Sequence, residues 1–454
     1  MAKNSLDQIR NAVVRDLQAL IQGRVISPAD EDYGNARKVW NGAVDHHPAA
    51  IAFCKSTADV QAAVRTARAH GLPVSVRAAG HDAAGRSVRS GALVIDLSLM
   101  NQVEVNGQTA TVAGGATSAK VIAAAAANGL LAVTGWNGVP GMTGLTTVGG
   151  YGPLIANHGL ALDSLTGAEL VLADGQHISV DSNNNPDLLW ALQGGGGNFG
   201  VVTSITIRLH PLRQVLGGMI LFPWSDAEAV LKSYAGAMIS ASNDLTVVIG
   251  ILSLPDGNPA LFLAPAWTGE MTQGEIFMDV LQRFGTPIYA QIGLMSYQDL
   301  VQSFDARVVN GRHYALETRW VPALTREVIS AVVAGGAGRS SPFSVIILQH
   351  FRGAPTQTSL DATAFGLRRE HFLIEMIASW DASAGDDGAS HRSWARDLCS
   401  TLAPMSLPGG YPNILGLHAH DQIAHAYGSN LVRLQTVKRR FDPDGLFSAT
   451  PFPV

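Results

Sequence analysis

The residues with the clearest chemical potential lie between positions 74 and 87, in the stretch Val-Ser-Val-Arg-Ala-Ala-Gly-His-Asp-Ala-Ala-Gly-Arg-Ser. The alternating valines predict a buried strand, and the small residues after it predict a tight turn. Because such a turn leaves its backbone N–H groups uncovered, it can surround an anion such as a pyrophosphate. One histidine, His81, projects from this turn. A single loop histidine is more often merely solvated, so its interpretation depends on the stretches that follow.

Three further glycine-rich stretches follow in the chain. Residues 114–118 precede an alanine-rich helix predicted over 119–127, where the helix dipole favours negative charge. Residues 134–152 have the highest glycine density, and the apolar residues among them favour a backbone surface for a flat ligand over a flexible surface loop. Residues 194–200 precede a strand predicted over 201–209. Together with the His81 turn, these stretches favour a bound nucleotide.

The composition sets the broad class of protein. At 454 residues, 47% of them hydrophobic and 15% charged, the chain is long enough for two globular domains. The formal net charge of −5 argues against nucleic acid as a partner. No signal peptide or membrane-length apolar run is visible, so we expect a cytoplasmic protein with no membrane partner. The 14 histidines and the two cysteines show no metal-ligand spacing, which predicts no metal and favours buried free thiols over a disulfide.

Helical and strand patterns alternate along the chain and predict an α+β fold. Glycine density falls near residue 212, and an antiparallel sheet with helices is expected after it. The predicted helices cover residues 5–22, 57–70, 119–127, 188–192, 226–239, 274–284 and 430–441. The predicted strands cover residues 74–76, 92–96, 108–113, 169–173, 176–180, 201–209, 218–222, 246–252, 260–266, 345–351 and 369–380.

Five motifs in a fixed order resemble the berberine-bridge-enzyme-like branch of the vanillyl-alcohol-oxidase flavoproteins. They are Arg77-Ala-Ala-Gly-His81, Gly144-Leu-Thr-Thr-Val-Gly-Gly-Tyr-Gly152, His158-Gly-Leu-Ala-Leu-Asp163, Gly194–Gly200 with Val201-Val-Thr203, and Asn430–Phe447. The resemblance runs from about residue 35 to the C-terminus. It implies a two-part FAD-binding domain, residues 1–212 and 410–454, closed by a substrate-binding domain, residues 213–409, whose antiparallel sheet is covered by helices.

The resemblance also implies the cofactor and its attachment. FAD is expected to be bonded through its 8α carbon to the ring of His81. Many relatives add a second bond from a cysteine, but Asn137 occupies that position here, so we expect a single tether. The other residues implied to contact FAD are Arg77, Ala78, Ala79, Gly80, Asp82, Ser87, Gly114, Thr117, Gly141, Gly144, Thr146, Thr147, Gly149, Gly150, Tyr151, Gly152, Gly200, Val201, Val202, Tyr411 and Asn413.

Tyr151 and Tyr411 match positions that are catalytic in sugar-oxidising relatives. A tyrosine acts as a base only if its pKa, near 10 when unperturbed, is lowered by its neighbours. Packing against the flavin is the alternative role for each. Gln349 and His350 are further catalytic candidates on one predicted strand, and strand alternation lets only one of them face the flavin. The expected substrate-binding residues are Tyr314, Glu317 and Glu375.

These inferences predict an FAD-dependent oxidase that takes a hydride from a small-molecule alcohol and passes the electrons to O2. The alcohol is expected to be a sugar or a secondary-metabolite hydroxyl, and the protein a monomer or homodimer. One alternative is an amine oxidase of the hydroxynicotine type. Others are a redox-neutral flavin cyclase or isomerase of natural-product biosynthesis, and a binding module that has lost catalysis.

Overall fold

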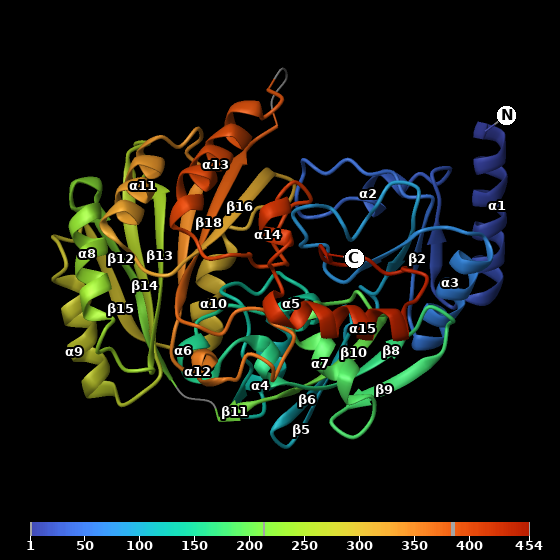
Figure 1. The fold of residues 1–454 in the computed structure, drawn as a ribbon, viewed down its shortest axis with the longest axis horizontal. Coiled ribbons are helices and arrows are strands. Elements are labelled where there is room, and N and C mark those ends of the chain that lie inside the picture. The colour runs from blue at the N-terminus through green and yellow to red at the C-terminus, as the bar shows by residue number, and fades with distance from the viewer. Residues whose placement is uncertain (1, 212–213, 383–385, 454) are drawn as a thin grey trace.

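The computed structural model describes residues 2–211, 214–382 and 386–453. Figure 1 shows two halves side by side: one built on a large sheet with helices on its outer face, the other on two smaller sheets. The mixture of helices and sheets is the α+β fold that the sequence predicts.

The first small sheet carries the His81 turn. It has four strands in the order β1-β2-β4-β3, and only the β1–β2 pair is antiparallel. Helix α3 begins after Ser56, whose side chain accepts the N–H of Asp59 and so caps the helix where the sequence predicts. The strands are β1 (Arg24–Ile26), β2 (Ala50–Phe53), β3 (Val74–Arg77) and β4 (Leu93–Asp96), and the covering helices are α1 (Ala2–Leu20) and α3 (Thr57–Ala69).

The second small sheet is wholly antiparallel, in the order β5-β6-β10-β8-β9. Its strands are β5 (Val103–Asn106), β6 (Thr109–Ala113), β8 (Leu165–Val171), β9 (His177–Asp181) and β10 (Val201–Arg208). Asp174 and Gly175 connect β8 to β9, and Gly175 takes the positive φ of 79° that such a turn favours. This turn and the β8–β9 pairing confirm the predicted hairpin at residues 169–180. A separate two-stranded sheet pairs β7 (Leu130–Leu131) with β11 (His210–Pro211).

Short helices connect the small sheets. Thr117 caps α4 (Ser118–Ala126) by accepting the N–H of Lys120, so the turn at 114–118 does lie at a helix N-terminus. The glycine-dense segment contains only the short helix α5 (Met142–Val148), as expected for a stretch that cannot be regular throughout. The remaining elements of this half are α2 (Tyr33–Ala36), α6 (Ile155–His158), η1 (Ala161–Ser164) and α7 (Pro186–Gly195).

The large sheet has seven antiparallel strands in the order β15-β12-β14-β13-β17-β18-β16. They are β12 (Val215–Pro223), β13 (Leu245–Ser253), β14 (Pro259–Trp267), β15 (Tyr289–Met295), β16 (His313–Val321), β17 (Val345–Phe351) and β18 (His371–Trp380). Helices pack on its outer face (Figure 1) and bury apolar side chains of its strands, least at the edge strand β15. They are η2 (Trp224–Asp226), α8 (Ala227–Ala237), α9 (Met271–Gln282), α11 (Arg326–Ala337) and α13 (Ala389–Leu402).

The C-terminal part of the chain returns to the smaller sheets. Helix α15 (Leu431–Phe441) packs against α7, far from it in the sequence (Figure 1). The other elements are α10 (Tyr297–Asp305), α12 (Ala354–Gln357), η3 (Ala403–Met405), α14 (His420–Ile423) and η4 (Gly428–Asn430). The predicted domain boundary at residues 212 and 213 lies outside the described residues, and the boundary at residues 409 and 410 stays a prediction.

Two sequence-based expectations concern single residues and membrane spans. Cys54 and Cys399 are both buried and free, as favoured above. In the described part of the chain, no helix combines the length and the apolar character that crossing a bilayer requires.

Candidate active site

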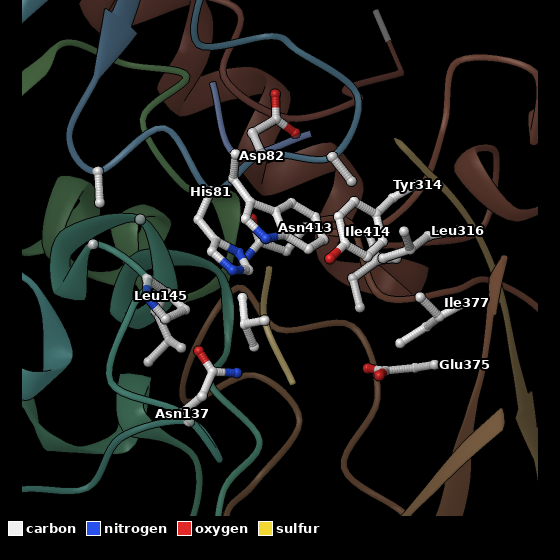
Figure 2. Close-up of a pocket in the computed structure, with 18 of the residues that line it drawn as sticks. His81, Asp82, Asn137, Leu145, Tyr314, Leu316, Glu375, Ile377, Asn413 and Ile414 are labelled. Atoms are coloured by element: carbon white, nitrogen blue, oxygen red, sulfur yellow. The ribbon is translucent and has the colours of Figure 1, made fainter. Parts of the chain in front are cut away.

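A cavity of about 610 Å³ lies between the large sheet and the smaller ones. One side is formed by the turn at residues 78–83, the loop at 135–141 and helix α5. The other side is formed by the inner faces of β13, β16, β17 and β18. Residues 447–450, from the last segment of the chain, close part of the wall. Figure 2 shows labelled residues from both sides converging on this space, among them His81, Asn137, Tyr314 and Glu375.

His81 projects from the turn after β3 into the cavity (Figure 2). Burial lowers the pKa of its imidazole to about 4, so the ring is neutral at physiological pH. Its Nε2 atom is buried and has no hydrogen-bond partner within the described structure. A neutral imidazole with an uncommitted ring nitrogen is suited to act as a nucleophile.

Other polar atoms of the cavity wall are also buried without partners. Among the described residues they include Trp40 Nε1, Ser87 Oγ, Asn137 Oδ1 and Gln349 Oε1. Buried polar atoms in native proteins are nearly always hydrogen-bonded, so these atoms indicate where a ligand supplies the missing partners. Backbone segments approach closely beside them: a Cβ on Gly141 would lie 3.0 Å from the Ala78 side chain. The cavity thus fits a large ligand with polar groups along its length.

A carboxyl group faces the cavity from the sheet side. The Gln349 amide on β17 donates a hydrogen bond to Glu375 Oε1 on β18, at 3.1 Å. Burial raises the pKa of Glu375 from 4.5 to about 7, outweighing that hydrogen bond. A carboxylate with a pKa near the working pH is suited to accept a proton in catalysis.

Tyr151 and Tyr411 lie next to this carboxyl group, with ring centroids 5.2 Å apart. The N–H of Gly150 donates to Tyr411 Oη at 2.9 Å, and Tyr151 Oη is 2.9 Å from His371 Nε2. Burial raises the pKa of Tyr411 to about 12 and that of Tyr151 well above 10. The lowered pKa required of a tyrosine base is therefore not found, which argues against the predicted catalytic role of either residue.

The rest of the sheet side is mostly apolar. Its apolar side chains are Val248, Leu252, Phe262, Leu316, Val345, Ile347 and Ile377, and Trp136 and Phe304 pack beside them. Its polar side chains are Ser253, Tyr314, Gln349 and Ser379, with Arg307 and Arg312 nearby. The apolar majority of this wall suits an apolar or aromatic substrate.

Comparison with known proteins agrees with this architecture. Residues 48–181 match the family described as FAD binding domain, and residues 411–451 match that described as berberine and berberine like. The chain is 29% identical to (R)-6-hydroxynicotine oxidase from Paenarthrobacter nicotinovorans, over 94% of its own length and 95% of the relative's.

The crystal structure of 6-hydroxy-D-nicotine oxidase from Arthrobacter nicotinovorans superimposes with a TM-score of 0.86 at 28% identity, covering 95% of this chain and 97% of that one. These matches identify the chain as an FAD-linked oxidoreductase that is similar to the berberine-bridge-like oxidases. The structure of glucooligosaccharide oxidase from Acremonium strictum, with a TM-score of 0.86 at 22% identity over 98% of both chains, shares the fold.

Most residues predicted to contact the cofactor or substrate line the cavity of this oxidoreductase. They are Ala78, Ala79, Gly80, His81, Asp82, Ser87, Gly141, Gly144, Thr147, Gly150, Tyr151, Tyr314, Gln349, Glu375, Tyr411 and Asn413. Their roles toward ligands remain proposals.

Two predicted residues of the oxidoreductase point away from the cavity. His350 lies on the outer face of β17, where it stacks on Phe372 and its Nε2 is 2.8 Å from Glu370 Oε1. Glu317 lies on the opposite face of β16 from Tyr314, and its Oε1 is 2.7 Å from His418 Nε2. Strand alternation places both on the side packed by helices and loops, so a direct catalytic or substrate-binding role for them is wrong.

Nine other predicted cofactor contacts lie behind the cavity wall and do not face it. Arg77 forms a buried ion pair with Asp96 and donates to the carbonyl oxygen of Ala36. Thr117 caps α4, and a Cβ on Gly114 would lie 2.6 Å from the carbonyl oxygen of Val202. The other six are also buried, and they are Thr146, Gly149, Gly152, Gly200, Val201 and Val202. None of the nine is among the residues that line the cavity, and their contact with a cofactor stays a prediction.

The sequence reading missed several residues that line the cavity. The most prominent is Trp40, which stacks on His81 with ring centroids 4.3 Å apart. Residues 447–450 were also missed, although the motif ending at Phe447 was part of the family resemblance. No local pattern marks Trp40, because its partner His81 lies in a different segment of the chain.

Proposed function

We propose that this FAD-linked oxidoreductase carries FAD on His81 and oxidises a predominantly apolar alcohol, with Glu375 accepting the hydroxyl proton. The observation that carries the proposal is the desolvated carboxyl of Glu375, with a pKa of about 7, at the end of an apolar cavity wall. FAD, when bound, supplies the acceptor for the hydride, and O2 is the final electron acceptor.

The proposal assigns a role to each main group of residues that line the cavity. The apolar side chains of β13 and β17 bind the substrate and exclude water. Gln349 holds Glu375 through the 3.1 Å hydrogen bond, and ionised Glu375 removes the hydroxyl proton as the adjacent C–H bond is broken. Tyr151 and Tyr411, neutral in this environment, position the reacting groups. The apolar wall favours a secondary-metabolite hydroxyl over a sugar.

A single tether at His81 is part of the same proposal. The related glucooligosaccharide oxidase carries a 6-S-cysteinyl, 8α-N1-histidyl FAD. In this chain the unpartnered ring nitrogen of His81 is Nε2, which is available for a single histidyl bond, whereas the cavity wall offers Asn137, whose amide cannot form a thioether.

Amine oxidation is the second candidate, favoured by the 29% identity to (R)-6-hydroxynicotine oxidase. An apolar cavity also suits a cyclic amine, and ionised Glu375 would then bind or deprotonate the nitrogen. The polar atoms at Gln349 and Glu375 serve either substrate, so the substrate itself must be tested.

Anaerobic reduction of the flavin separates these candidates. The protein would be mixed with aryl alcohols, sugars and cyclic amines while flavin absorbance is followed. We expect bleaching by apolar alcohols; bleaching by amines alone would replace the alcohol by the amine proposal. Net turnover of a substrate without O2 consumption would instead indicate a redox-neutral cyclase or isomerase.

Acid precipitation tests the tether. The yellow colour of the wild-type protein should remain in the pellet, and that of His81→Ala should pass into the supernatant. Colour in the supernatant for both proteins would contradict covalent attachment at His81.

A further inference from the structure

The ring of His81 is the end of a three-ring stack. The indole of Trp40 lies on the imidazole with centroids 4.3 Å apart and planes 15° apart. Its other face lies on the phenol of Tyr314, with centroids 4.0 Å and planes 20° apart. Tyr314 comes from β16 of the large sheet, and Figure 2 shows it beside Leu316, on the sheet side of the cavity. The stack thus joins residues from three distant segments of the chain.

Backbone hydrogen bonds fix Trp40 from both sides. Its N–H donates to the carbonyl oxygen of Gly80 at 3.1 Å, immediately before His81. Its carbonyl oxygen accepts the N–H of Gly311 at 3.0 Å, just before β16. The next residue, Asn41, continues the connection: its side chain donates to the carbonyl oxygen of Ala83 and accepts the N–H of Tyr314. Trp40 is therefore a rigid support that cannot shift without disturbing the His81 turn.

The approach of these segments is too close for larger residues. A Cβ on Gly42 would lie 2.1 Å from the carbonyl oxygen of Gly311, and the N–H of Gly42 donates to the carbonyl oxygen of Arg312 at 2.9 Å. The segment 40–42 and the start of β16 are thus built to meet. This close contact fixes the backbone from which the indole extends over the imidazole.

We propose that Trp40, backed by Tyr314, is the positioning residue for covalent attachment of FAD to His81. The inference rests on the His81 tether of the proposed function. The indole prevents rotation of the imidazole, so that its buried, unpartnered ring nitrogen keeps one orientation. A nucleophile held in the reacting geometry gains rate because its orientation is already set before the bond forms.

Attachment requires a defined exchange of atoms and electrons. A bond forms between an imidazole nitrogen and the 8α carbon, while one C–H bond and the N–H bond of the imidazole are broken. The two electrons and two protons released pass to the isoalloxazine, and O2, the acceptor already named, takes them as it becomes hydrogen peroxide. Trp40 takes no part in this exchange and acts only through the orientation of His81.

The test measures the rate at which FAD becomes covalently attached to the protein, separately from the amount of FAD that is bound. Flavin-free protein, produced under riboflavin limitation, is mixed with FAD in air. The covalent fraction is read as flavin fluorescence of the denatured protein, and total bound FAD is measured before denaturation. The variants are Trp40→Leu, which removes the ring, Trp40→Phe, which keeps one, and the pair Tyr314→Leu and Tyr314→Phe, which repeats the comparison one ring further away.

For Trp40→Leu we expect attachment to slow by about tenfold, the factor that a well-made aromatic stack can contribute, with total bound FAD unchanged. Trp40→Phe and Tyr314→Phe should stay within about twofold of the wild type, and Tyr314→Leu should fall between. Unchanged attachment in Trp40→Leu would overturn the inference, as would an equal loss of total bound FAD, which indicates a structural role. If Trp40→Leu does not fold, the Tyr314 pair decides in the same way. If the wild-type protein forms no covalent flavin, the proposed His81 tether itself is wrong. This result differs from normal attachment in Trp40→Leu, which contradicts only the role of Trp40.

Discussion

Two features of the surroundings of Glu375 shift its pKa in opposite directions: burial of the carboxyl and its hydrogen bond from the Gln349 amide. Burial raises its pKa to about 7, and the Gln349 hydrogen bond lowers it only in part. As a base, Glu375 must be ionised, so kcat/KM should rise with pH up to about 7 and then level off. This profile, measured with a bleaching substrate, should have a single ionisation on its acid side.

Replacing that carboxyl should remove both the rate and the profile. We expect Glu375→Gln to lower kcat by about 10²- to 10⁴-fold, the usual contribution of a general base, and to abolish the acid-side ionisation. Gln349→Leu is the control. It leaves the Glu375 carboxyl in place but removes its hydrogen bond, so it should only raise the pKa of the acid-side ionisation. Wild-type activity in Glu375→Gln would assign the proton to another group.

Because its pKa is raised in the folded protein, ionised Glu375 lowers the free energy of unfolding at high pH. Its pKa is 4.5 in the unfolded chain and about 7 in the folded one, so its contribution to stability is present below 4.5 and lost as pH rises through 7. Glu375→Gln should therefore gain about 2–3 kcal/mol of unfolding free energy relative to the wild type between pH 5 and pH 8. Urea unfolding at the two pH values measures this difference. An equal effect of the substitution at both would contradict the raised pKa.

Individual site residues were predictable where a motif or a strand period marked them. The turn motif predicts His81, and strand alternation limits Gln349 and His350 to one cavity-facing residue. Alternation alone does not say which of the two it is, because that depends on which face of β17 the helices cover. The same ambiguity explains why Glu317 was expected at the cavity, which instead is lined by Tyr314 and Leu316 of the same strand.

At the scale of elements, the C-terminal helix α15 holds the last segment of the cavity wall in place. Lys438 Nζ donates to the carbonyl oxygens of Asn198 and Phe447, at 2.6 and 2.7 Å, and pairs with Asp442 Oδ2 at 2.5 Å. Asn198 in turn accepts the N–H of Ala449 at 2.7 Å. One buried ammonium group thus connects α15, the loop at 194–200 and residues 447–450.

Lys438→Met should release this connection. The substitution keeps the length of the side chain but leaves Asp442, which is 1% exposed, as an uncompensated buried charge. We expect a loss of about 3–5 kcal/mol of stability and weaker retention of FAD. Thermal unfolding and flavin content measure the two effects. Arg439→Met, on the exposed side of the same helix, should change neither, and Lys438→Met/Asp442→Asn should recover part of the loss.

Element prediction failed where the strands were atypical. Strand β15 is the edge of the large sheet and mostly exposed, so it lacks the apolar alternation of a half-buried strand. Strand β16 carries His, Glu, Thr and Arg among its apolar residues, because both of its faces meet polar groups. The inner strands, with their long apolar runs, were predicted close to their observed positions.

At the scale of the whole molecule, the cavity is assembled from segments that only the tertiary fold brings together. Trp40, His81 and Tyr314 form one stack although each comes from a separate segment. The family resemblance could imply the two-part arrangement, but no periodicity in the sequence links these three positions. A ligand that fills the cavity therefore touches the N-terminal turn, the large sheet and the C-terminal segment at once.

Such a ligand should stabilise the whole chain rather than one sheet. In His81→Ala, where FAD can bind only reversibly, each tenfold rise in free FAD above its Kd should add about 1.4 kcal/mol of unfolding free energy. The Tm of this variant should accordingly rise with FAD concentration in a single transition, whereas fully loaded wild-type protein serves as a control and should not respond. A Tm of His81→Ala that is insensitive to excess FAD would show that the cavity does not bind the cofactor. Two separated transitions, only one of which moves with FAD, would show that the large sheet unfolds independently of the cofactor-binding part.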